Sequence, residues 1–372
     1  MKLICARSSR PKLEFLEERT VPTLSSTSLL ADASGNFAAT LVASNPTLNI
    51  AYDGATATLS LDDGGTPLVI SGVTGNVTIN ARTTAAATSV FLTNASFADT
   101  FAGNFTLSTS RALTGTNADA NIQLVTTAAA TILGNVRLTT NTPAESICSI
   151  IPAATFPLTI AGSISITTNG SGTGINTNKV VNFSPQAALT IGGGLFASNT
   201  NVFSCNAGSA PMTINGSTVI QTRASATSPN IVQLFSLATT DLVFQRLQIA
   251  LGNSGNVSKG VVIQNATINE LLTISLGNHS GATSSFINLV GLQVNGSLVS
   301  ITGGTGNKFI LFSDVSAPLA RLTVSLGNAA SNLVVFAGSN NAFLYTTLVG
   351  GTGTNTVIGT IPSPFKLIRF SF

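Results

Sequence analysis

The sequence predicts an all-β protein, a right-handed parallel β-helix (β-solenoid) whose coils contain about 25 residues each. Three observations predict this fold. Short segments alternate apolar and polar residues, these segments end in Gly-Asn or Gly-Gly turns, and they recur at a nearly constant spacing along the chain. No stretch shows the 3.6-residue apolar spacing of an amphipathic helix with a charged face.

The clearest alternating segments precede Gly252, Gly277 and Gly327, and an asparagine follows each of these glycines. In each segment the first, third and fifth residues before the glycine are large and aliphatic, and those between are mostly polar or small. A period of two is typical of a β-strand with one buried face. Each segment is therefore predicted to be one strand of a coil.

The middle aliphatic residue of this pattern can be followed along the chain, and it marks one rung per coil. Ten steps separate the first and last of these residues, so the mean repeat is about 27 residues. Ile50 would lie one rung earlier. The predicted rungs are Ile79, Leu107, Leu138, Ile166, Leu195, Ile220, Ile249, Ile274, Ile301, Val324 and Leu348.

A repeat of this length, made of strand and turn, excludes the other common repeat folds. Propeller blades need about 40–50 residues, ankyrin-like repeats need helices, and the leucine-rich repeat pattern is absent. In a solenoid each coil stacks about 4.8 Å from the next, so eleven or twelve rungs predict a rod of roughly 55 Å.

The composition has a physical explanation in this fold. Only 8% of the 372 residues are charged, against about 25% in an average soluble domain. Like charges repel when identical positions stack, whereas asparagine, serine and threonine can form hydrogen-bonded ladders. Phe286, Phe312 and Phe336 recur at a similar spacing and are interpreted as a core stack rather than a ligand platform.

The same composition excludes several classes of function. Sixteen basic residues spread over 372 positions do not form a nucleic-acid-binding patch. One histidine and three cysteines leave little material for a zinc site. Polar residues or glycine interrupt every apolar run, so no transmembrane helix is predicted.

The chain divides into an N-terminal segment, residues 1–30, and a single solenoid domain, residues 31–372. The first segment holds 8 of the 29 charged residues, and we expect it to be mobile. Its apolar run ends at Arg7, too early for an ordinary signal peptide. Terminal caps are expected near residues 31–50 and 355–372, the latter containing Pro362 and Pro364.

One motif lies in the N-terminal segment. Residues 10–22 read Arg-Pro-Lys-Leu-Glu-Phe-Leu-Glu-Glu-Arg-Thr-Val-Pro. This stretch resembles the short Leu-Glu-x-Leu-Glu-x-Arg-x-x-Pro segment near the start of many planctomycete secreted and surface proteins. The resemblance covers only these residues. It implies export and an extracellular or cell-surface location.

A carbohydrate-active β-helix enzyme would need carboxylates gathered on one face. Asp241, Glu270 and Asp314 lie at different phases of the repeat, and Arg246 and Arg321 share a phase three rungs apart, roughly 14 Å. Two carboxylates within about 10 Å in a cleft would favour the enzyme. The candidates are Asp53, Asp62, Asp63, Asp99, Asp119 and Glu145.

The remaining motifs have simple structural interpretations. The acidic Asp62-Asp63-Gly64-Gly65 stretch is interpreted as a turn rather than a calcium loop. The Gly303–Lys308 loop lacks the spacing of a phosphate-binding loop. His279 is interpreted as a solvated turn histidine, and Cys148 and Cys205 as buried free thiols about 10 Å apart.

We therefore predict a secreted or cell-surface structural or adhesive protein, not an enzyme, that binds carbohydrate or surface proteins through hydrogen bonds. No catalytic, cofactor-binding or metal-binding residues are assigned, and no cofactor or nucleic acid is expected. The first alternative is a polysaccharide lyase or hydrolase. A weaker one is an outer-membrane β-barrel, suggested by the alternation of Ile368, Phe370 and Phe372 but disfavoured by two tyrosines and no tryptophan.

Overall fold

A computed structural model describes most of the chain. The predicted attachment-like segment falls almost wholly outside the described residues, and so does its 10–22 motif. The described residues are 29–43, 45–83, 90–110, 119–142, 145–169, 179–208, 210–225, 228–238, 241–255, 259–280 and 284–371.

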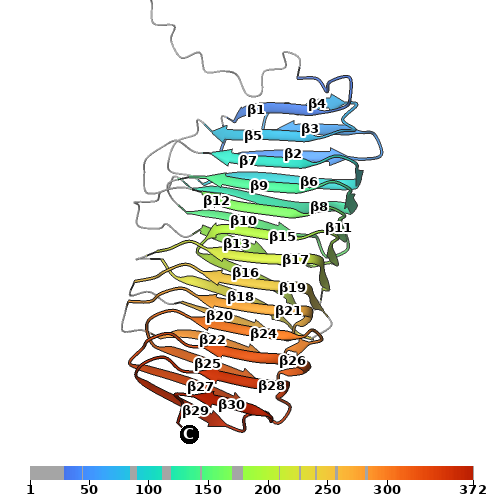
Figure 1. Cartoon of the computed structure of the whole chain (residues 1–372). Helices are drawn as coiled ribbons and strands as arrows, with labels where there is room; N and C mark the ends of the chain where they lie inside the picture. The colour runs from blue at the N-terminus through green and yellow to red at the C-terminus, as the bar shows by residue number, and fades with distance from the viewer. Residues whose placement is uncertain are drawn as a thin grey trace, which may run out of the picture.

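The described residues form thirty β-strands and no helix, joined in one continuous sheet that winds into stacked coils (Figure 1). Nearly all pairings are parallel and join one coil to the next, as in a parallel β-helix. This confirms the predicted fold class. No helix in these residues is long and apolar enough to cross a membrane.

Three faces run along the coils. The strands that carry the predicted rungs form the first face. The strands that come next along the chain after each of these form the second face. The first face contains β1 (Phe37–Ala43), β5 (Val77–Thr83), β7 (Phe105–Ser110), β9 (Val136–Asn141), β12 (Ile164–Asn169), β15 (Leu195–Thr200), β24 (Leu298–Gly303), β30 (Phe365–Ile368) and the C-terminal parts of β17 (Met212–Thr222), β19 (Leu242–Leu251), β21 (Thr267–Leu276), β26 (Ser316–Ser325) and β28 (Ala342–Val349).

The second face is built in the same way, and the third face is narrow. The third face contains β11 (Leu158–Ile160), β14 (Leu189–Ile191), β23 (Gln293–Val294) and the remaining parts of the long strands. The second face contains β2 (Thr47–Asp53), the N-terminal parts of β6 (Phe91–Phe101) and β8 (Ala120–Ile132), then β10 (Ser146–Ile151), β13 (Lys179–Phe183), β16 (Val202–Gly208), β18 (Asn230–Ser236), β20 (Lys259–Gln264), β22 (Ser285–Val290), β25 (Lys308–Ser313), β27 (Ser331–Ala337) and β29 (Thr354–Gly359).

The predicted rungs are register partners in the structure with one exception. The series from Ile79 to Ile166 is paired strand to strand, and so is the series from Ile220 to Leu348. The partner of both Ile166 and Ile220 is Ala197, so the assignment of Leu195 was wrong by two residues. Both residues point inward, and alternation alone does not distinguish an alanine rung from the leucine beside it.

The suggested first rung was also wrong. Ile50 lies in β2 of the second face and pairs with Ala95. The partner of Ile79 in the first coil is Ala39 of β1. A small residue again stands at the rung position, and the large aliphatic residue assigned in its place, Ile50, lies eleven residues later in a strand of another face.

The aromatic series is partly as predicted. Phe312 and Phe336 are register partners inside the core, with ring centroids 5.0 Å apart and planes at 11°. Phe286 does not belong to this stack. It points outward and pairs with Phe309, while Leu289 lies opposite Phe312.

Polar ladders follow the turns, as predicted. On the turn that enters the first face, the side-chain oxygen of Asn36 accepts from the backbone N–H of Asn76, at 2.8 Å, and the same bond is repeated from coil to coil through Asn104 and Asn135 to Ser163. A second ladder after the first face joins Asn253 to Asn278, at 2.9 Å. These bonds tie neighbouring coils together without charge.

The two ends differ. At the N-terminal end β2 pairs with β3 (Thr58–Asp62), and β3 pairs with β4 (Leu68–Ser71); both pairings are antiparallel. Residues 31–50 hold β1 and the start of β2, so they form the first coil. At the C-terminal end β30 continues the first face beside β28, and Ser371 bridges to Thr356 of β29.

Candidate functional site

Three of the acidic residues considered for catalysis, Asp53, Asp62 and Asp314, accept hydrogen bonds from turn N–H groups. The carboxylate of Asp53 accepts from the backbone N–H of Ala55 at 3.0 Å, and that of Asp62 accepts from Gly64 at 2.7 Å. These are the Asx-turn bonds expected of Asp-Gly and Asp-rich turns. Asp314 has a positive φ of 53° and accepts from the N–H groups of the 338–340 turn.

Asp119 and Glu145 each stand directly before a second-face strand, β8 and β10, and pairing of these strands brings the two residues together. The backbone N–H of Glu145 donates to the carboxylate of Asp119 at 3.1 Å. Burial raises the pKa of Glu145, the charge of Asp119 raises it further, and Lys179 opposes both. Both residues are among the six candidate carboxylates of the sequence analysis, but the sequence does not indicate that these two meet.

Lys179 completes this group from inside the coil. Its side chain is fully buried, and its Nζ donates to the backbone carbonyl of Thr142 at 2.7 Å. Burial lowers the pKa of Lys179 to about 8; Arg223 acts in the same direction, and Asp119 and Glu145 oppose it. Because the ammonium faces the interior, it neutralises the acids from within and is not placed to reach a bound polymer.

The surface hollows lie elsewhere. A cavity of about 600 Å³ at the C-terminal end is lined by Gly351–Asn355 and Arg369–Ser371. A second cavity, of about 280 Å³, lies on the second face beside Ser204, Gln233 and Phe235. No carboxylate lines either cavity, and no group of three or more metal-ligating residues occurs in the described part of the chain.

Lys179 belongs to a column of buried polar residues, which we call the inner polar column. It runs along the start of the second-face strands, where pairing places one residue per coil, and every member is at most 4% exposed. The column comprises Ser146, Lys179, Asn201, Asn230, Lys259, Ser285, Lys308, Asn332 and Asn355.

The other two lysines of the column use loop carbonyls. Nζ of Lys259 donates to the backbone oxygen of Asn278 at 3.2 Å, and Nζ of Lys308 donates to that of Gly306. Burial lowers the pKa of each to about 8, and Lys308 lowers that of Lys259 further by its charge. The Gly303–Lys308 loop therefore leads into a buried lysine and strand β25, and not into a helix.

His279 is not the solvated turn residue predicted from the sequence. It is 2% exposed, and its Nδ1 lies 2.8 Å from the hydroxyl of Ser254 in the preceding coil. Its backbone N–H donates to the carbonyl of Thr305 in the next coil, at 3.1 Å. The turns of the preceding and following coils enclose this turn. A prediction from the sequence of one turn does not take these neighbouring coils into account.

The cysteines behave as predicted. Cys148 and Cys205 are free and buried. Burial raises the pKa of the Cys205 thiol to about 12 and that of Cys148 well above its ordinary range. Both thiols are therefore held in the unreactive protonated form.

The charged residues of the C-terminal half are distributed as the repeat predicts. Pairing places Arg246 and Arg321 three rungs apart in one column. Glu270 forms an ion pair with Arg246 in the adjacent coil, and hydrogen bonds from Gln245 and Arg246 lower its pKa. The two side chains are 49% and 38% exposed, so the pair ties two coils together at the surface.

The outward side of the first face carries two columns of hydroxyl groups in its C-terminal half. We call these six side chains the hydroxyl array. Neighbouring members lie about 4.8 Å apart along a column and about 7 Å apart across a strand. The array comprises Thr273, Ser300 and Thr323 in one column and Ser275, Thr302 and Ser325 in the other.

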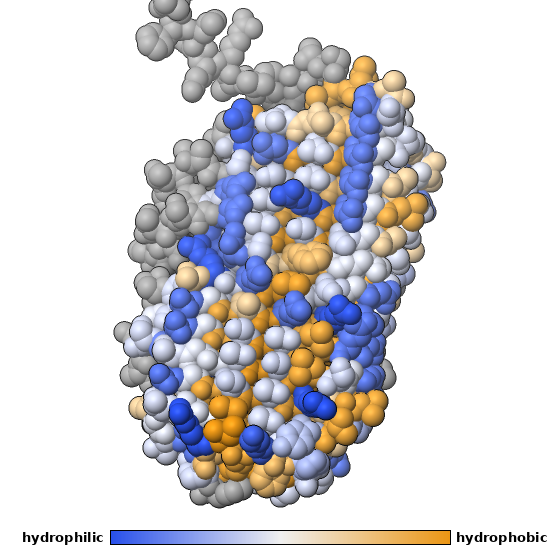
Figure 2. Space-filling view, viewed as in Figure 1, coloured by the Kyte–Doolittle hydropathy of each residue, from blue (hydrophilic) through white to orange (hydrophobic). Residues whose placement is uncertain are grey.

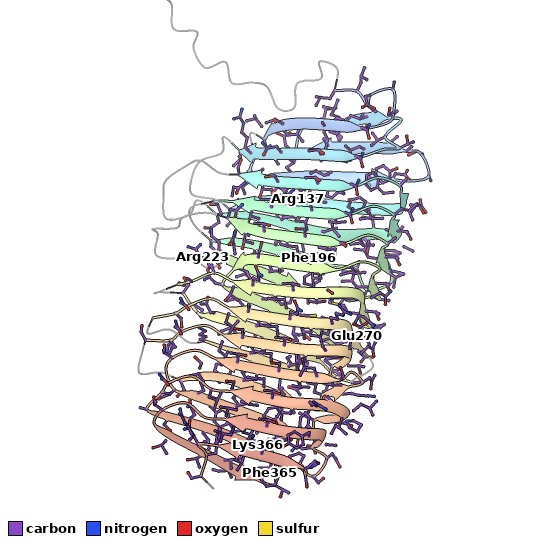
Figure 3. All side chains as sticks on the ribbon, viewed as in Figure 1. Arg137, Phe196, Arg223, Glu270, Phe365 and Lys366 are labelled. Carbon is purple, nitrogen blue, oxygen red and sulfur yellow. The ribbon has the colours of Figure 1, made fainter. Side chains whose placement is uncertain are left out.

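The array lies on a largely uncharged face. Figure 2 shows this face as a mixture of weakly polar and hydrophobic areas, with hydrophilic stripes at its edges. Arg137, Phe196 and Lys366 lie on the same face, in β9, β15 and β30 (Figure 3). Phe196 is 44% exposed. The face therefore offers repeated hydroxyls, the exposed rings of Phe196 and Phe365, and a few widely separated cations.

Searches for a matching protein-family model, a similar curated protein and a similar solved structure found no match.

Proposed function

We propose that this protein is a secreted or cell-surface structural and adhesive solenoid without catalytic activity, and that its hydroxyl array binds polysaccharide. The observation that supports this function is the register of the array. Pairings without a register shift hold its hydroxyls in two straight columns. A rigid, repeating arrangement of donors and acceptors suits a ligand that repeats in the same way.

A linear polysaccharide offers hydroxyl groups at regular intervals. A single hydrogen bond of this kind contributes about 0.5–1.5 kcal/mol net. Several bonds formed by one chain act together, since binding at one site raises the effective concentration of the polymer at the next. Phe196 adds an exposed aromatic surface for the apolar side of a sugar ring.

The pairing of Asp119 with Glu145 favours a second candidate, a polysaccharide-cleaving enzyme. Glu145 has the raised pKa of a general acid, and Asp119 is close enough to influence it. Against this, the third charged member, Lys179, is buried, and no carboxylate lines the two cavities described above. Asp119, Glu145 and Lys179 fit better as charged residues that stabilise the start of the second-face strands.

Replacing Thr302 and Thr323 by valine is expected to weaken polysaccharide binding roughly tenfold, because two hydrogen-bonding hydroxyls are lost while β-branched shape is kept. Sedimentation with insoluble cellulose and chitin measures this. The control is Thr78→Val, which removes a first-face hydroxyl far from the array. Wild-type protein that binds neither polymer would contradict the proposal.

Incubation with cellulose and chitin also distinguishes the non-catalytic adhesive protein from the polysaccharide-cleaving enzyme. If incubation releases new reducing ends or unsaturated sugars, and Glu145→Gln abolishes that release, the enzyme is the better description.

Deleting residues 1–28 is expected to remove the protein from the cell surface while leaving the solenoid folded. The first 28 residues carry the export-like motif and lie outside the described coils. Cell fractionation and surface protease accessibility measure the location, and the β-sheet circular dichroism signal checks folding. Unchanged surface exposure of the truncated protein would argue against a role of this segment in export.

A further inference from the structure

The outward side of the second face is uncharged in strands β16 to β29 and carries many large apolar side chains, with Ser, Thr, Asn and Gln side chains between them. In strands β16 to β29, no outward position of the described residues is Asp, Glu, Lys or Arg. We call the large apolar side chains there the apolar patch. It comprises Val202, Ile231, Phe235, Val262, Phe286, Phe309, Leu311, Leu333, Val335 and Ile358.

The patch is regular along the rod. Phe286, Phe309 and Leu333 follow one another in one column, and Leu311, Val335 and Ile358 in the next. The four pairings from β20 to β29 contain no register shift. Figure 1 shows these strands stacked one on another. The columns are therefore straight from β20 to β29, and the one register shift among the patch strands lies between β16 and β18, at Asn206 and Gly208.

One glycine keeps this surface smooth. A Cβ built on Gly260 would lie 2.4 Å from the ring of Phe286, so the ring occupies the hollow above the glycine. A large side chain that lies across the strand in this way fills a gap instead of projecting from the sheet. Ile358, by contrast, is 53% exposed at the end of the patch.

The outward surface of strands β16 to β29, which carries the patch, is large enough for a stable interface. Seven strands at about 4.8 Å, each with about 18 Å of outward surface, give roughly 600 Å² per molecule and about 1,200 Å² for two. Specific interfaces bury about 1,200–2,000 Å² in total.

We infer that two copies of this chain associate through the apolar patch, with sheet packed against sheet. A partner with charged residues here would lose their hydration without gaining an opposite charge. The matching surface must be flat, extended and uncharged, and the second face of another copy has these properties. Two such sheets pack about 10 Å apart. The hydroxyl arrays, on a different face, stay free on both molecules.

Light scattering coupled to size-exclusion chromatography, on the full chain from about 1 to 100 µM, tests this inference. Wild-type protein should elute as a dimer. Leu311→Glu should be monomeric, with the dissociation constant raised at least ~100-fold, because its carboxylate would be buried in the interface. Thr302→Glu is the matched control, since it places the same charge on the first face, and it should remain a dimer.

Folding is checked on every variant by circular dichroism. If Leu311→Glu does not fold, Leu311→Thr replaces it, because threonine favours strands and removes apolar surface without adding a charge. Wild-type protein that is monomeric at 100 µM would overturn the inference. So would a folded patch variant that dimerises as tightly as the wild type.

Discussion

Replacing both Lys259 and Lys308 by methionine is expected to stabilise the protein at pH 7. Burial lowers the pKa of each lysine from 10.5 to about 8, so at pH 7 the folded state holds two ammonium groups where charge is disfavoured. A shift of this size corresponds to about 3 kcal/mol per lysine. The methionines leave the carbonyls of Asn278 and Gly306 without these donors, at about 1 kcal/mol each. The expected net gain is about 2–5 kcal/mol.

The pH dependence gives a sharper test of the same charges. Between about pH 8 and 10.4 the lysines are neutral in the folded protein and still protonated in the unfolded chain. The unfolded state then binds more protons, so the stability contributed by these groups rises with pH in this window. Below pH 8 the full penalty is present. The advantage of the double variant over the wild type should therefore shrink from pH 8 to 10.4.

The two cysteines act in the opposite direction and must be separated from this effect. Their raised pKa values keep the folded thiols protonated, whereas unfolded thiols ionise above about pH 8.5. This lowers stability with rising pH in every variant equally. The difference between wild type and double variant cancels it, because Cys148 and Cys205 are present in both.

Urea unfolding from pH 7 to 10.4 measures that difference. Lys366→Met is the matched control, since Lys366 is exposed on β30, and it should change stability little at any pH. A double variant less stable than the wild type at pH 7 would contradict the prediction. A stability difference that stays constant to pH 10.4 would contradict the assigned cause.

The fold could be predicted because apolar and polar side chains alternate along each strand and this pattern recurs in every coil. Rungs such as Ile274, Ile301 and Val324 are aliphatic and lie next to Gly-Asn or Gly-Gly turns, so strand and turn signals agree. At Ala197 the two signals diverged. The rung is held there by backbone pairing on both sides, and the sequence pattern favours a neighbouring leucine that also points inward.

The interior charge could not be predicted from general preferences, because lysine is almost never fully buried without a partner. The signal was nevertheless present. Lys179, Lys259 and Lys308 each stand at an inward position of an alternating strand, two residues before an inward valine or isoleucine. The meeting of Asp119 and Glu145 depends on how loops of unequal length bring two coils into register, and periodicity does not contain that information.

Close stacking of the coils also depends on glycine, which has no Cβ, at one turn. Gly103, Gly134 and Gly162 stand above one another on the turn that enters the first face. A Cβ built on Gly134 would lie 2.3 Å from the carbonyl oxygen of Gly103, and one on Gly162 would lie 2.5 Å from that of Gly134. Both neighbours are backbone atoms, so they cannot rotate away as a flexible side chain would.

Gly134→Ala is therefore expected to destabilise the protein by about 3 kcal/mol. The coils cannot simply separate, because the adjacent Asn135 is bonded to Asn104 through its backbone N–H at 2.8 Å and its side-chain amide at 3.2 Å. Relief of the clash would break these bonds. Exchange of backbone amide hydrogens should accelerate first in β9 and its neighbours β7 and β12, which pair directly with it.

Gly72→Ala separates crowding from backbone conformation. Gly72 has a φ of 76°, but nothing lies within 4 Å of a Cβ built there. Its substitution should cost about 1–2 kcal/mol, the cost of the left-handed conformation alone. Gly134 has no positive φ, so its larger cost would come from contact between coils. Urea unfolding of the two variants decides the matter: if Gly134→Ala costs no more than Gly72→Ala, close coil contact at this turn does not limit stability.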